Sequence, residues 1–327
     1  MSALSRGLVA DLGGTNARFA CADIGPAGEV AIHDLVRLKA RDYQTADAAI
    51  RAYLDQASDP NLSFVSIACA GPVRDGQVAL TNLGWTVSEH ALKPLMNDGS
   101  THLLNDLAAV AWAAPRLTPA DLTPLAEGRE PYRDDVIAVL GVGTGTNCAA
   151  YVKGAGAEGS VIVGESGHIS FAPNDAMEAK IWTYLLDRYG RVSIERLVSG
   201  PGIFNIYQAV CHIEGAPETC VNSEAVSRQA DGGDPVAALA IDRFCRVLGA
   251  VAGDFVLTFD ATAVHIAGGI APALMCTPER IAAFAQGFGN KGRFRPYVER
   301  VSAYVITHPY AALMGAARAA SIERRAF

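Results

Sequence analysis

The sequence predicts an α/β fold made of two domains, and three observations support this prediction. The chain has 327 residues, which is more than one domain of ordinary size holds. Strand-like apolar runs alternate with helix-like segments along the chain, an order typical of α/β architectures. A unit of strand, Gly/Thr turn and strand occurs at 8–21 and again at 136–152, and two such units are hard to assign to chance.

Composition excludes several classes of protein. Hydrophobic residues make up 50% of the chain, which is enough for full cores, and the charged fraction of 19% is too low for a disordered chain. The net charge of −7 predicts no broad attraction to nucleic acid. It does not forbid an anionic substrate, because backbone N–H groups can build a local phosphate site. No apolar run approaches the ~18 residues that span a bilayer, so we expect no membrane insertion.

The cysteines and the N-terminal segment predict a cytoplasmic protein. Seven cysteines are scattered along the chain without any Cys-x-x-Cys pair. This pattern is typical of a reducing compartment and argues against a structural zinc. The segment 1–6 is too short for a signal peptide and leads directly into a strand.

The first turn has the residues of a phosphate site. An apolar strand ends at Asp11, and Gly13, Gly14, Thr15 and Asn16 follow before a second strand begins. Glycines allow a sharp turn and a close ligand, and an acid beside them suits a nearby Mg²⁺. The pattern is neither a Walker loop nor a dinucleotide fingerprint, since no Gly-Lys-Ser/Thr follows and a strand comes next. A plain hairpin with Gly-Gly at its tip is the alternative.

The remainder of the first domain alternates strands and helices. Apolar residues recur at helical spacing in 43–56, and Gly71-Pro72 and Pro115 end a strand and a helix. The segment 115–135 is rich in Pro, Arg and acids and predicts the domain boundary. The expected elements are strands at 30–38, 64–70, 78–82 and 101–104 and helices at 43–56, 89–95 and 107–114.

The second domain begins with the repeated unit. The strand 136–140 runs into Gly143-Thr144-Gly145, and another strand follows. Asp234-Pro235 is a strong helix start, an N-cap followed by a proline at the first helical position. The later expected elements are strands at 160–164, 263–267 and 301–307 and helices at 176–189, from 201 to about 210, 235–259 and 310–322.

Together these motifs resemble the sugar-kinase, Hsp70 and actin ATPase fold, and within it the bacterial ATP-dependent glucokinases. The resemblance covers nearly the whole chain and rests on the order of Asp11-Leu-Gly-Gly-Thr-Asn-Ala-Arg, Leu104-Asn-Asp, Gly141-Val-Gly-Thr-Gly, Gly164-Glu-Ser-Gly-His, Glu195-Arg-Leu-Val-Ser-Gly-Pro-Gly and Gly268-Gly-Ile. It implies a small domain, 1–115 plus 310–327, and a large one, 116–309, with a cleft between them. It is also compatible with a homodimer.

The resemblance implies phosphoryl transfer from ATP to the 6-hydroxyl of glucose, with ATP and Mg²⁺ as cofactors. Asp106 would be the general base. The residues expected to bind the sugar are Asn105, Asp106, Glu165, His168 and Glu195. Those expected to bind ATP are Asp11, Gly13, Gly14, Thr15, Asn16, Gly143, Thr144, Gly145, Gly268 and Gly269, with Asp11 holding Mg²⁺ through water.

Each of these residues also has a simpler interpretation. Asp106 could N-cap the helix that follows it, and Glu165 and His168 could be metal ligands, although no third ligand is nearby in sequence. Glu195 could form a surface salt bridge with Arg191 or Arg196, and Gly268-Gly269 could be a plain turn. The alternative functions are a kinase for another hexose or an amino sugar, and a sugar-responsive binding protein, which would need an N-terminal helix-turn-helix. An actin-like or chaperone ATPase would not need the sugar-binding residues.

Two positions depart from the pattern of the family. Asn147 stands where the second phosphate loop usually has a glycine, and Ser166 replaces a glycine in the Gly-Glu-Gly-Gly-His motif. Asparagine tolerates a positive φ better than most residues, which predicts that the loop keeps its shape.

Overall fold

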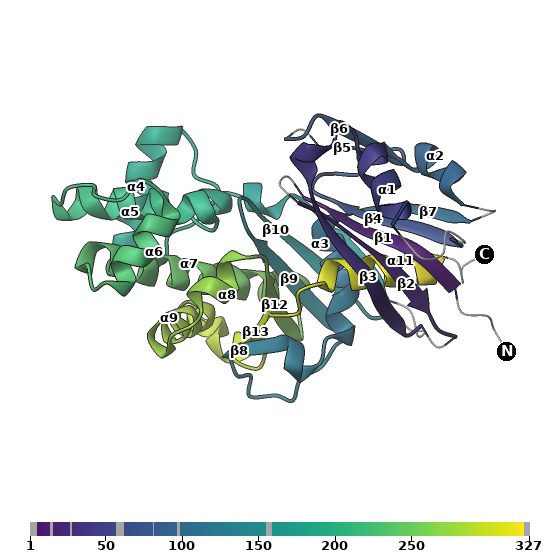
Figure 1. Ribbon diagram of the computed structural model, residues 1–327. Helices are drawn as coiled ribbons and strands as arrows, with labels where there is room; N and C mark the ends of the chain where they lie inside the picture. The colour runs from purple at the N-terminus through teal and green to yellow at the C-terminus, as the bar shows by residue number, and fades with distance from the viewer. Residues whose placement is uncertain are drawn as a thin grey trace. The chain divides into compact units, whose positions relative to one another are not determined.

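The computed structural model describes residues 5–13, 16–26, 28–56, 62–80, 82–96, 99–154 and 159–323, and the chain divides into two compact units (Figure 1). The first unit comprises Met1–Arg116, Gly154–Val163 and His308–Phe327. The second comprises Leu117–Lys153 and Gly164–Thr307. The short segment Gly154–Val163, which the sequence places in the larger domain, lies with the first unit because its strand β11 (Ser160–Val163) contacts helix α3 (Asp106–Ala113).

A mixed sheet forms the centre of the first unit. Its strands lie in the order β3-β2-β1-β4-β7. The pairs β1–β2 and β2–β3 are antiparallel, whereas β1–β4 and β4–β7 are parallel. The bounds are β1 (Ser5–Leu12), β2 (Asn16–Ile24), β3 (Val30–Lys39), β4 (Phe64–Cys69) and β7 (Ser100–Asn105).

Successive residues of these strands point to opposite faces, and each face has its own core. Leu8 packs in the core that includes Ile50 and Tyr53 of α1 (Ala46–Leu54). Its neighbour Val9 packs with α11 (Ala311–Glu323) on the other face. The first core also takes in the hairpin of β5 (Gln77–Leu80) and β6 (Trp85–Ser88), which leads into α2 (Glu89–Leu92).

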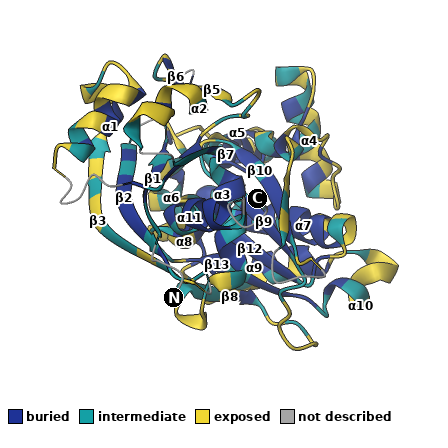
Figure 2. Cartoon of the chain, turned by 90° about the vertical axis from the view of Figure 1, so that its right-hand side faces the viewer, coloured by how far each residue is buried: buried dark blue, intermediate teal, exposed yellow. Residues whose placement is uncertain are grey.

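Helices α3 and α11 pack closely against each other. A Cβ at Gly315 of α11 would lie 1.6 Å from the carbonyl oxygen of Ala109 in α3, so only glycine fits there. Both helices are largely buried (Figure 2). Ser66 of β4 adds a bond from its hydroxyl to the carbonyl of Ala316, 2.7 Å away. The C-terminal helix is therefore an integral part of the first unit.

The second unit repeats this plan with a larger core. The strands that belong to this unit lie in the order β10-β9-β12-β13-β8. The pairs β10–β9 and β13–β8 are antiparallel, and β9–β12 and β12–β13 are parallel. The bounds are β8 (Leu122–Ala126), β9 (Val136–Val142), β10 (Thr146–Val152), β12 (Ala263–Ala267) and β13 (Ser302–Ile306).

Strand β8 lies inside the segment that the sequence interprets only as a domain boundary. The strand contains Pro124, which has no N–H to donate to a sheet. Proline is tolerated in edge strands, and β8 ends the strand order of its sheet. The sequence therefore did not predict this edge strand, because its segment is rich in proline.

Helix α7 (Pro235–Phe259) is the central helix of the second unit. The Asp234 side chain accepts from the Ala237 N–H at 2.8 Å and caps its start, as the sequence predicts. Gly249 lets α9 (Pro278–Gly289) approach, since a Cβ there would lie 2.0 Å from the Phe284 carbonyl oxygen. The other helices are α4 (Ala176–Tyr189), α5 (Gly200–Glu214), α6 (Ser223–Asp231), α8 (Ile270–Leu274) and α10 (Arg295–Val298).

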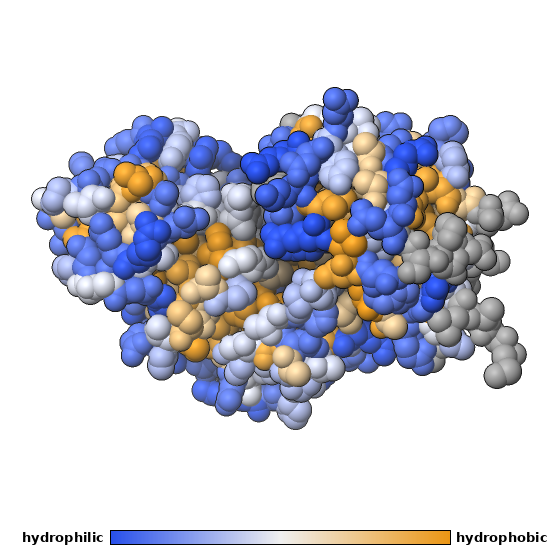
Figure 3. All heavy atoms as spheres, in the orientation of Figure 1, coloured by the Kyte–Doolittle hydropathy of each residue, from blue (hydrophilic) through white to orange (hydrophobic). Residues whose placement is uncertain are grey.

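The surface is mainly hydrophilic on the face drawn in Figure 3, with smaller hydrophobic areas. All seven cysteines lie within the described residues and are free thiols, and only Cys276 among them is exposed. Among the helices of the described chain, none combines the length and the apolar character needed to cross a membrane.

Candidate active site

Asp11 ends β1 in the first unit and is fixed by an ion pair. The antiparallel register places Arg18 of β2 directly opposite, and its Nη1 donates to Asp11 Oδ2 at 2.8 Å. The Asp11 side chain is 16% exposed. Burial raises the pKa of Asp11, and the Arg18 guanidinium opposes that rise. The carboxylate thus has a defined position beside the first Gly-rich turn.

The turn itself is described at its two ends. The Gly13 N–H donates to the Asn16 carbonyl at 3.1 Å, and Arg37 of β3 donates from Nε to Asn16 Oδ1 at 3.1 Å. Gly14 and Thr15, two of the residues expected to bind ATP, lie outside the described residues. The ends of the turn are therefore held by the hairpin and by the neighbouring strand.

Asn105 and Asp106 lie at the same edge of the sheet as Asp11. The parallel registers align Leu12 with Cys69 and Cys69 with Asn105, so β1, β4 and β7 end side by side. The pKa of Cys69 is raised to about 12, chiefly by burial and further by the carboxylates of Asp106 and Asp11. Ligands of open α/β sheets bind outside the carboxyl ends of the strands, which is where these groups lie.

The N-cap of α3 is Asn105, and the interpretation of Asp106 as that cap is wrong. Asn105 Oδ1 accepts from the N–H groups of Leu107 at 3.0 Å and Ala108 at 3.3 Å. Its Nδ2 donates to the Gly71 carbonyl at 3.2 Å. Asp106 is the first helical residue, and its Oδ1 accepts from the Leu107 N–H at 2.8 Å. The Asp106 carboxylate is therefore not needed as the cap.

The second Gly-rich turn joins β9 to β10 in the second unit. The Gly143 N–H donates to the Gly145 carbonyl at 2.9 Å, and the Gly200 N–H donates to the Gly143 carbonyl at 2.8 Å. Gly200 is the first residue of α5, whose N-cap is Ser199. The turn, with Thr144 at its centre, therefore lies against the N-terminus of a long helix, an environment that favours anions.

Glu195 contacts this turn and not an arginine. Its Oε2 accepts from the Thr146 N–H at 2.9 Å, and the Ser199 hydroxyl donates to its carbonyl at 2.8 Å. Of the two arginines considered as partners, Arg191 donates to the His168 carbonyl at 2.7 Å, and Arg196 stacks over Tyr189. The surface salt bridge weighed for Glu195 is thus not the arrangement found in the described structure.

Glu165 and His168 flank a short 3₁₀ turn at Ser166–His168 and are both exposed. The His168 N–H donates to the Glu165 carbonyl at 3.1 Å. A Cβ at Gly167 would lie 1.9 Å from the Thr146 carbonyl oxygen, so this glycine brings the motif against β10. Within the described residues no third His, Cys, Asp or Glu joins this pair in a metal-sized cluster, which leaves the metal interpretation without support.

The two departures from the family pattern bond to each other. Asn147 Oδ1 accepts from the Ser166 N–H at 2.8 Å and from the Ser166 hydroxyl at 3.0 Å, and its Nδ2 donates to the Gly164 carbonyl. Where the family pattern has two glycines, this chain has an asparagine and a serine, and their hydrogen bonds connect the Glu165 motif to β10.

Gly268 and Gly269 follow β12, which runs parallel to β9. Gly268 has φ +98, and a Cβ there would lie 2.2 Å from the Val142 carbonyl oxygen, so a side chain is excluded on two grounds. Gly269 has an ordinary φ of −76, and a Cβ there would meet nothing within 4 Å. The first glycine is needed by the turn, and the second leaves open space beside it.

Sequence reasoning assigned no role to two residues that hold the site. Arg18 is the last residue of the motif that begins at Asp11. The hairpin register, which pairs Arg18 with Asp11, is the signal that could have identified it as the ion-pair partner. Ser199 precedes Gly200-Pro201, a typical helix start, and it bonds the main chain of Glu195.

Comparisons with known proteins agree with this geometry. A protein-family model described as Glucokinase matches residues 8–323. A curated glucokinase of Caulobacter sp. (strain K31) is 38% identical over 327 residues, which is 100% of this chain and 98% of the relative. A glucokinase of Zymomonas mobilis subsp. mobilis is 36% identical over 94% of this chain and 95% of its own length. The chain belongs to the glucokinase family.

Solved structures of glucokinases share the fold. The crystal structure of a glucokinase from an Antarctic psychrotroph has a TM-score of 0.86 and 32% identity, covering 97% of this chain and 99% of its own. A ROK family glucokinase from Streptomyces griseus, solved with glucose and AMPPNP, has a TM-score of 0.61 and 20% identity, covering 98% of this chain and 100% of its own. These findings confirm the predicted two-domain sugar-kinase fold and an ATP-dependent hexose phosphotransferase, and they do not favour a binding protein.

Proposed function

We propose that this glucokinase-family chain transfers the γ-phosphoryl group of ATP to the 6-hydroxyl of glucose, with Asp106 as general base. One observation carries the assignment of the base. Asp106 lies where β7 passes into α3, at the edge of the sheet that also holds Asp11, while Asn105 supplies the helix cap. The Asp106 carboxylate accepts from the Leu107 N–H through Oδ1 and lies where ligands of such sheets bind.

The base acts on the attacking hydroxyl. As the sugar oxygen bonds to the γ-phosphorus, Asp106 takes the hydroxyl proton, and ADP leaves in line on the opposite side. A positioned base contributes about 10²–10⁴-fold to the rate. Orientation of the two reactants contributes more, roughly 7–11 kcal/mol, so the residues that hold sugar and nucleotide supply most of the acceleration.

Glu165, His168, Glu195 and Asn105 are proposed to bind the sugar. Hydroxyl groups need both donors and acceptors, and carboxylate, imidazole and amide groups supply them. Glu195 Oε2 accepts a hydrogen bond from the Thr146 N–H, and we assign the other carboxylate oxygen of Glu195 to a sugar hydroxyl. The side-chain oxygen of Asn105 caps the helix, and its Nδ2 donates one N–H to the Gly71 carbonyl. We therefore propose that the second N–H of Nδ2 donates to the sugar.

The two Gly-rich turns are proposed to hold the phosphates of ATP. Gly13, Gly14, Thr15 and Asn16 would supply N–H groups and small side chains from the first unit. Gly143, Thr144 and Gly145 would do so from the second, beside the N-terminus of α5. The open space at Gly269 lets the nucleoside approach the main chain there, next to Gly268.

Asp11 is proposed to hold Mg²⁺ through water. Arg18 bonds one of its carboxylate oxygens, and the carboxylate as a whole lies at the carboxyl end of β1 beside the turn. This fits an ion that keeps several water ligands and binds through one or two carboxylates and substrate phosphates. When bound, Mg²⁺ neutralises charge on the transferring phosphates.

The test is an assay of ADP release over a panel of hexoses and amino sugars. We expect the highest kcat/KM with glucose. In Glu165→Ala and His168→Ala, the loss of a partner to a sugar hydroxyl costs about 1–3 kcal/mol, so the KM for glucose should rise roughly 5- to 150-fold with little change in melting temperature. A preference for another sugar would assign that sugar instead, and unchanged glucose kinetics in both variants would remove the motif from the sugar site. A homodimer and a cytoplasmic location stay predictions.

A further inference from the structure

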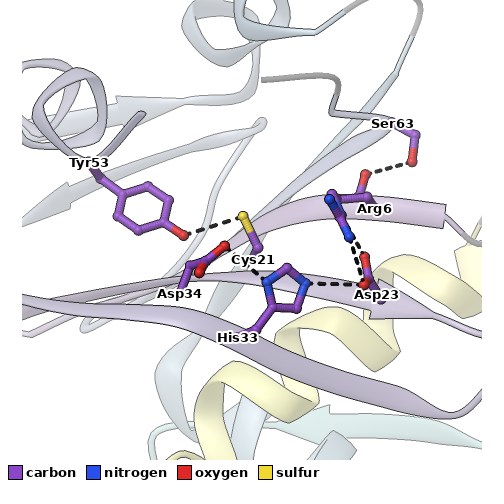
Figure 4. Close-up of polar contacts among 7 residues, drawn as sticks. All are labelled: Arg6, Cys21, Asp23, His33, Asp34, Tyr53 and Ser63. Carbon is purple, nitrogen blue, oxygen red and sulfur yellow. Dashed lines mark hydrogen bonds and ion pairs between the residues drawn. The ribbon is translucent and has the colours of Figure 1, made fainter. Parts of the chain in front are cut away.

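A second cluster of ligand-type side chains lies on the sheet of the first unit, on strands β2 and β3. The antiparallel register makes Cys21 and His33 direct cross-strand partners. Side chains of directly opposed residues lie on the same face with Cβ atoms about 4.5–5.5 Å apart. Figure 4 shows the Cys21 thiol and the His33 ring on one face of these strands, with Asp34 beside them.

A β-bulge brings the third side chain to the same place. The pairing shifts by one residue between Phe19–Val36 and Cys21–His33, so β3 holds an extra residue there. Asp34 lies in this bulge with φ +52, an unusual conformation for a residue other than glycine. Without the bulge, Asp34 would point to the face opposite to His33, because side chains alternate along a strand. With it, both side chains reach Cys21.

The three ligand atoms have the spacing of a metal site. The Cys21 sulfur, one ring nitrogen of His33 and a carboxylate oxygen of Asp34 all lie within 4.8 Å of one another. His33 Nδ1 and Asp34 Oδ2 are 3.1 Å apart, close to the separation of about 3.4 Å that nitrogen and oxygen ligands have on a tetrahedral zinc. Cys21 is 2% exposed, whereas the Asp34 side chain is 46% exposed, so the cluster is closed at the sulfur and open at the carboxylate.

Neighbouring residues orient the imidazole. His33 Nε2 lies 3.1 Å from Asp23 Oδ2, and Arg6 holds Asp23 through two bonds of 2.8 and 3.1 Å. A metal at Nδ1 requires the proton on Nε2, where Asp23 accepts it. This carboxylate–histidine–metal arrangement is the usual support of a ligating histidine. Burial raises the pKa of the Cys21 thiol, and the Tyr53 hydroxyl, which donates to the Cys21 sulfur at 3.4 Å, opposes that rise.

We propose that Cys21, His33 and Asp34 form a binding site for a divalent transition metal of the zinc type. Thiolate and imidazole ligands select such ions over Mg²⁺, which prefers oxygen ligands and strict octahedral geometry. Three protein ligands leave a fourth position for water or an external ligand. The sequence argued against zinc because no Cys-x-x-Cys pair occurs, but here register and bulge assemble the ligands from residues 21, 33 and 34.

The test uses the full chain without nucleotide or sugar, titrated with Co²⁺ and followed by absorbance. We expect one Co²⁺ per chain with a thiolate-to-cobalt charge-transfer band, displaced by Zn²⁺ and retained in excess Mg²⁺. Absence of the band in the unmodified chain, or its loss on adding Mg²⁺, would overturn the proposal.

Variants assign the ligands. Cys21→Ser should lose the band. Asp34→Asn keeps a residue that tolerates positive φ and removes the carboxylate, so it should fold normally and bind Co²⁺ more than about 10-fold more weakly. Asp23→Asn should weaken binding by about 10- to 100-fold, as expected for a partner of a ligating histidine.

Cys276→Ser is the matched control, because Cys276 is an exposed thiol on the second unit and should have no effect. A band that persists in Cys21→Ser, or one lost in Cys276→Ser, would refute the site. If Cys21→Ser fails to fold, full Co²⁺ affinity in folded Asp34→Asn would refute it equally.

Discussion

The two Gly-rich turns share a backbone design but differ in what holds them. The first follows Asp11, and its neighbourhood is fixed by side chains, Arg18 on the carboxylate and Arg37 on Asn16. The second has no acid before it and is fixed through its main chain, by the Gly200 N–H on Gly143. The first turn thus offers a carboxylate suited to a cation, and the second offers N–H groups and a helix N-terminus suited to an anion.

The two copies of the repeated motif are therefore suited to different ligands. In the first unit Asp106 and Asp11, the carboxylates proposed as the base and the cation ligand, share the edge of the sheet. In the second unit Glu195, which lies outside the turn in sequence, accepts a hydrogen bond from the main-chain N–H of Thr146 and thereby supports the loop. Substitutions can test each half of this comparison separately.

The largest effect is expected at the base. Asp106→Asn preserves size but cannot accept a proton, so kcat should fall at least about 10²-fold, the low end for loss of a general base. Affinities for glucose and MgATP should stay close to those of the unmodified chain. Because Asn105 caps α3, the melting temperature should not change. Steady-state kinetics measure kcat, and isothermal titration measures the affinities for glucose and MgATP, so the two effects can be separated. Near-normal turnover of Asp106→Asn would contradict the mechanism.

The glycines after β12 should respond differently to the same change. Gly268→Ala forces a side chain into φ +98 and against the Val142 carbonyl, which should cost more than about 1 kcal/mol of unfolding free energy. Gly269→Ala meets open space, so its stability should stay within about 0.5 kcal/mol while the KM for ATP rises. Denaturant unfolding and kinetics on both variants check this pair. Equal stability of the two would contradict the packing described here.

The polar pair of the second unit should show energetic coupling. Asn147→Ala leaves the Ser166 N–H and hydroxyl without their acceptor, at a cost of about 1–3 kcal/mol. Ser166→Ala removes only the hydroxyl. In a double-mutant cycle measured by unfolding, the two changes should cost less together than the sum of the single costs, by at least about 0.5 kcal/mol. Strict additivity would mean that the hydroxyl bond contributes nothing.

The smallest effect is a pH shift confined to the first turn. The folded pKa of Asp11 is raised by burial and restrained by Arg18. Arg18→Met should therefore move the acid limb of kcat/KM for MgATP to higher pH. Because the pKa of Asp11 is higher in the folded chain than in the unfolded chain, the buried carboxylate lowers the free energy of unfolding at pH values above the unfolded pKa. This destabilisation disappears as the pH falls and Asp11 becomes protonated in the folded chain. Loss of activity in acid should then precede unfolding.

Arg37→Met is the control for this pH shift, because Arg37 bonds the Asn16 amide and not the carboxylate. Its pH profile should match that of the unmodified chain. Identical acid limbs in Arg18→Met and Arg37→Met would show that Asp11 does not govern the profile.

Much of the fold could be predicted from local signals. The Asp234-Pro235 start and the apolar periodicity predicted α7, and the segment predicted to be helical at 176–189 has the bounds of α4. Such signals are informative because an N-cap and an apolar stripe act within a few residues. The strand β8 was missed, because a proline at a sheet edge looks like a linker until the sheet is known. At the site, Asn105 and Asp106 were found together, but their separate roles in the helix start required coordinates.

The sequence by itself determined the repeated strand–turn–strand units, the helices with strong caps and the family to which their motifs belong. Only the tertiary structure decided that Glu195 supports the Thr146 main chain, that Asn147 meets Ser166, and that a bulge gathers Cys21, His33 and Asp34. The physical reason is the range of the interactions. Caps and periodicity act between near neighbours in the chain, whereas strand register and loop packing join residues whose spacing in sequence carries no signal.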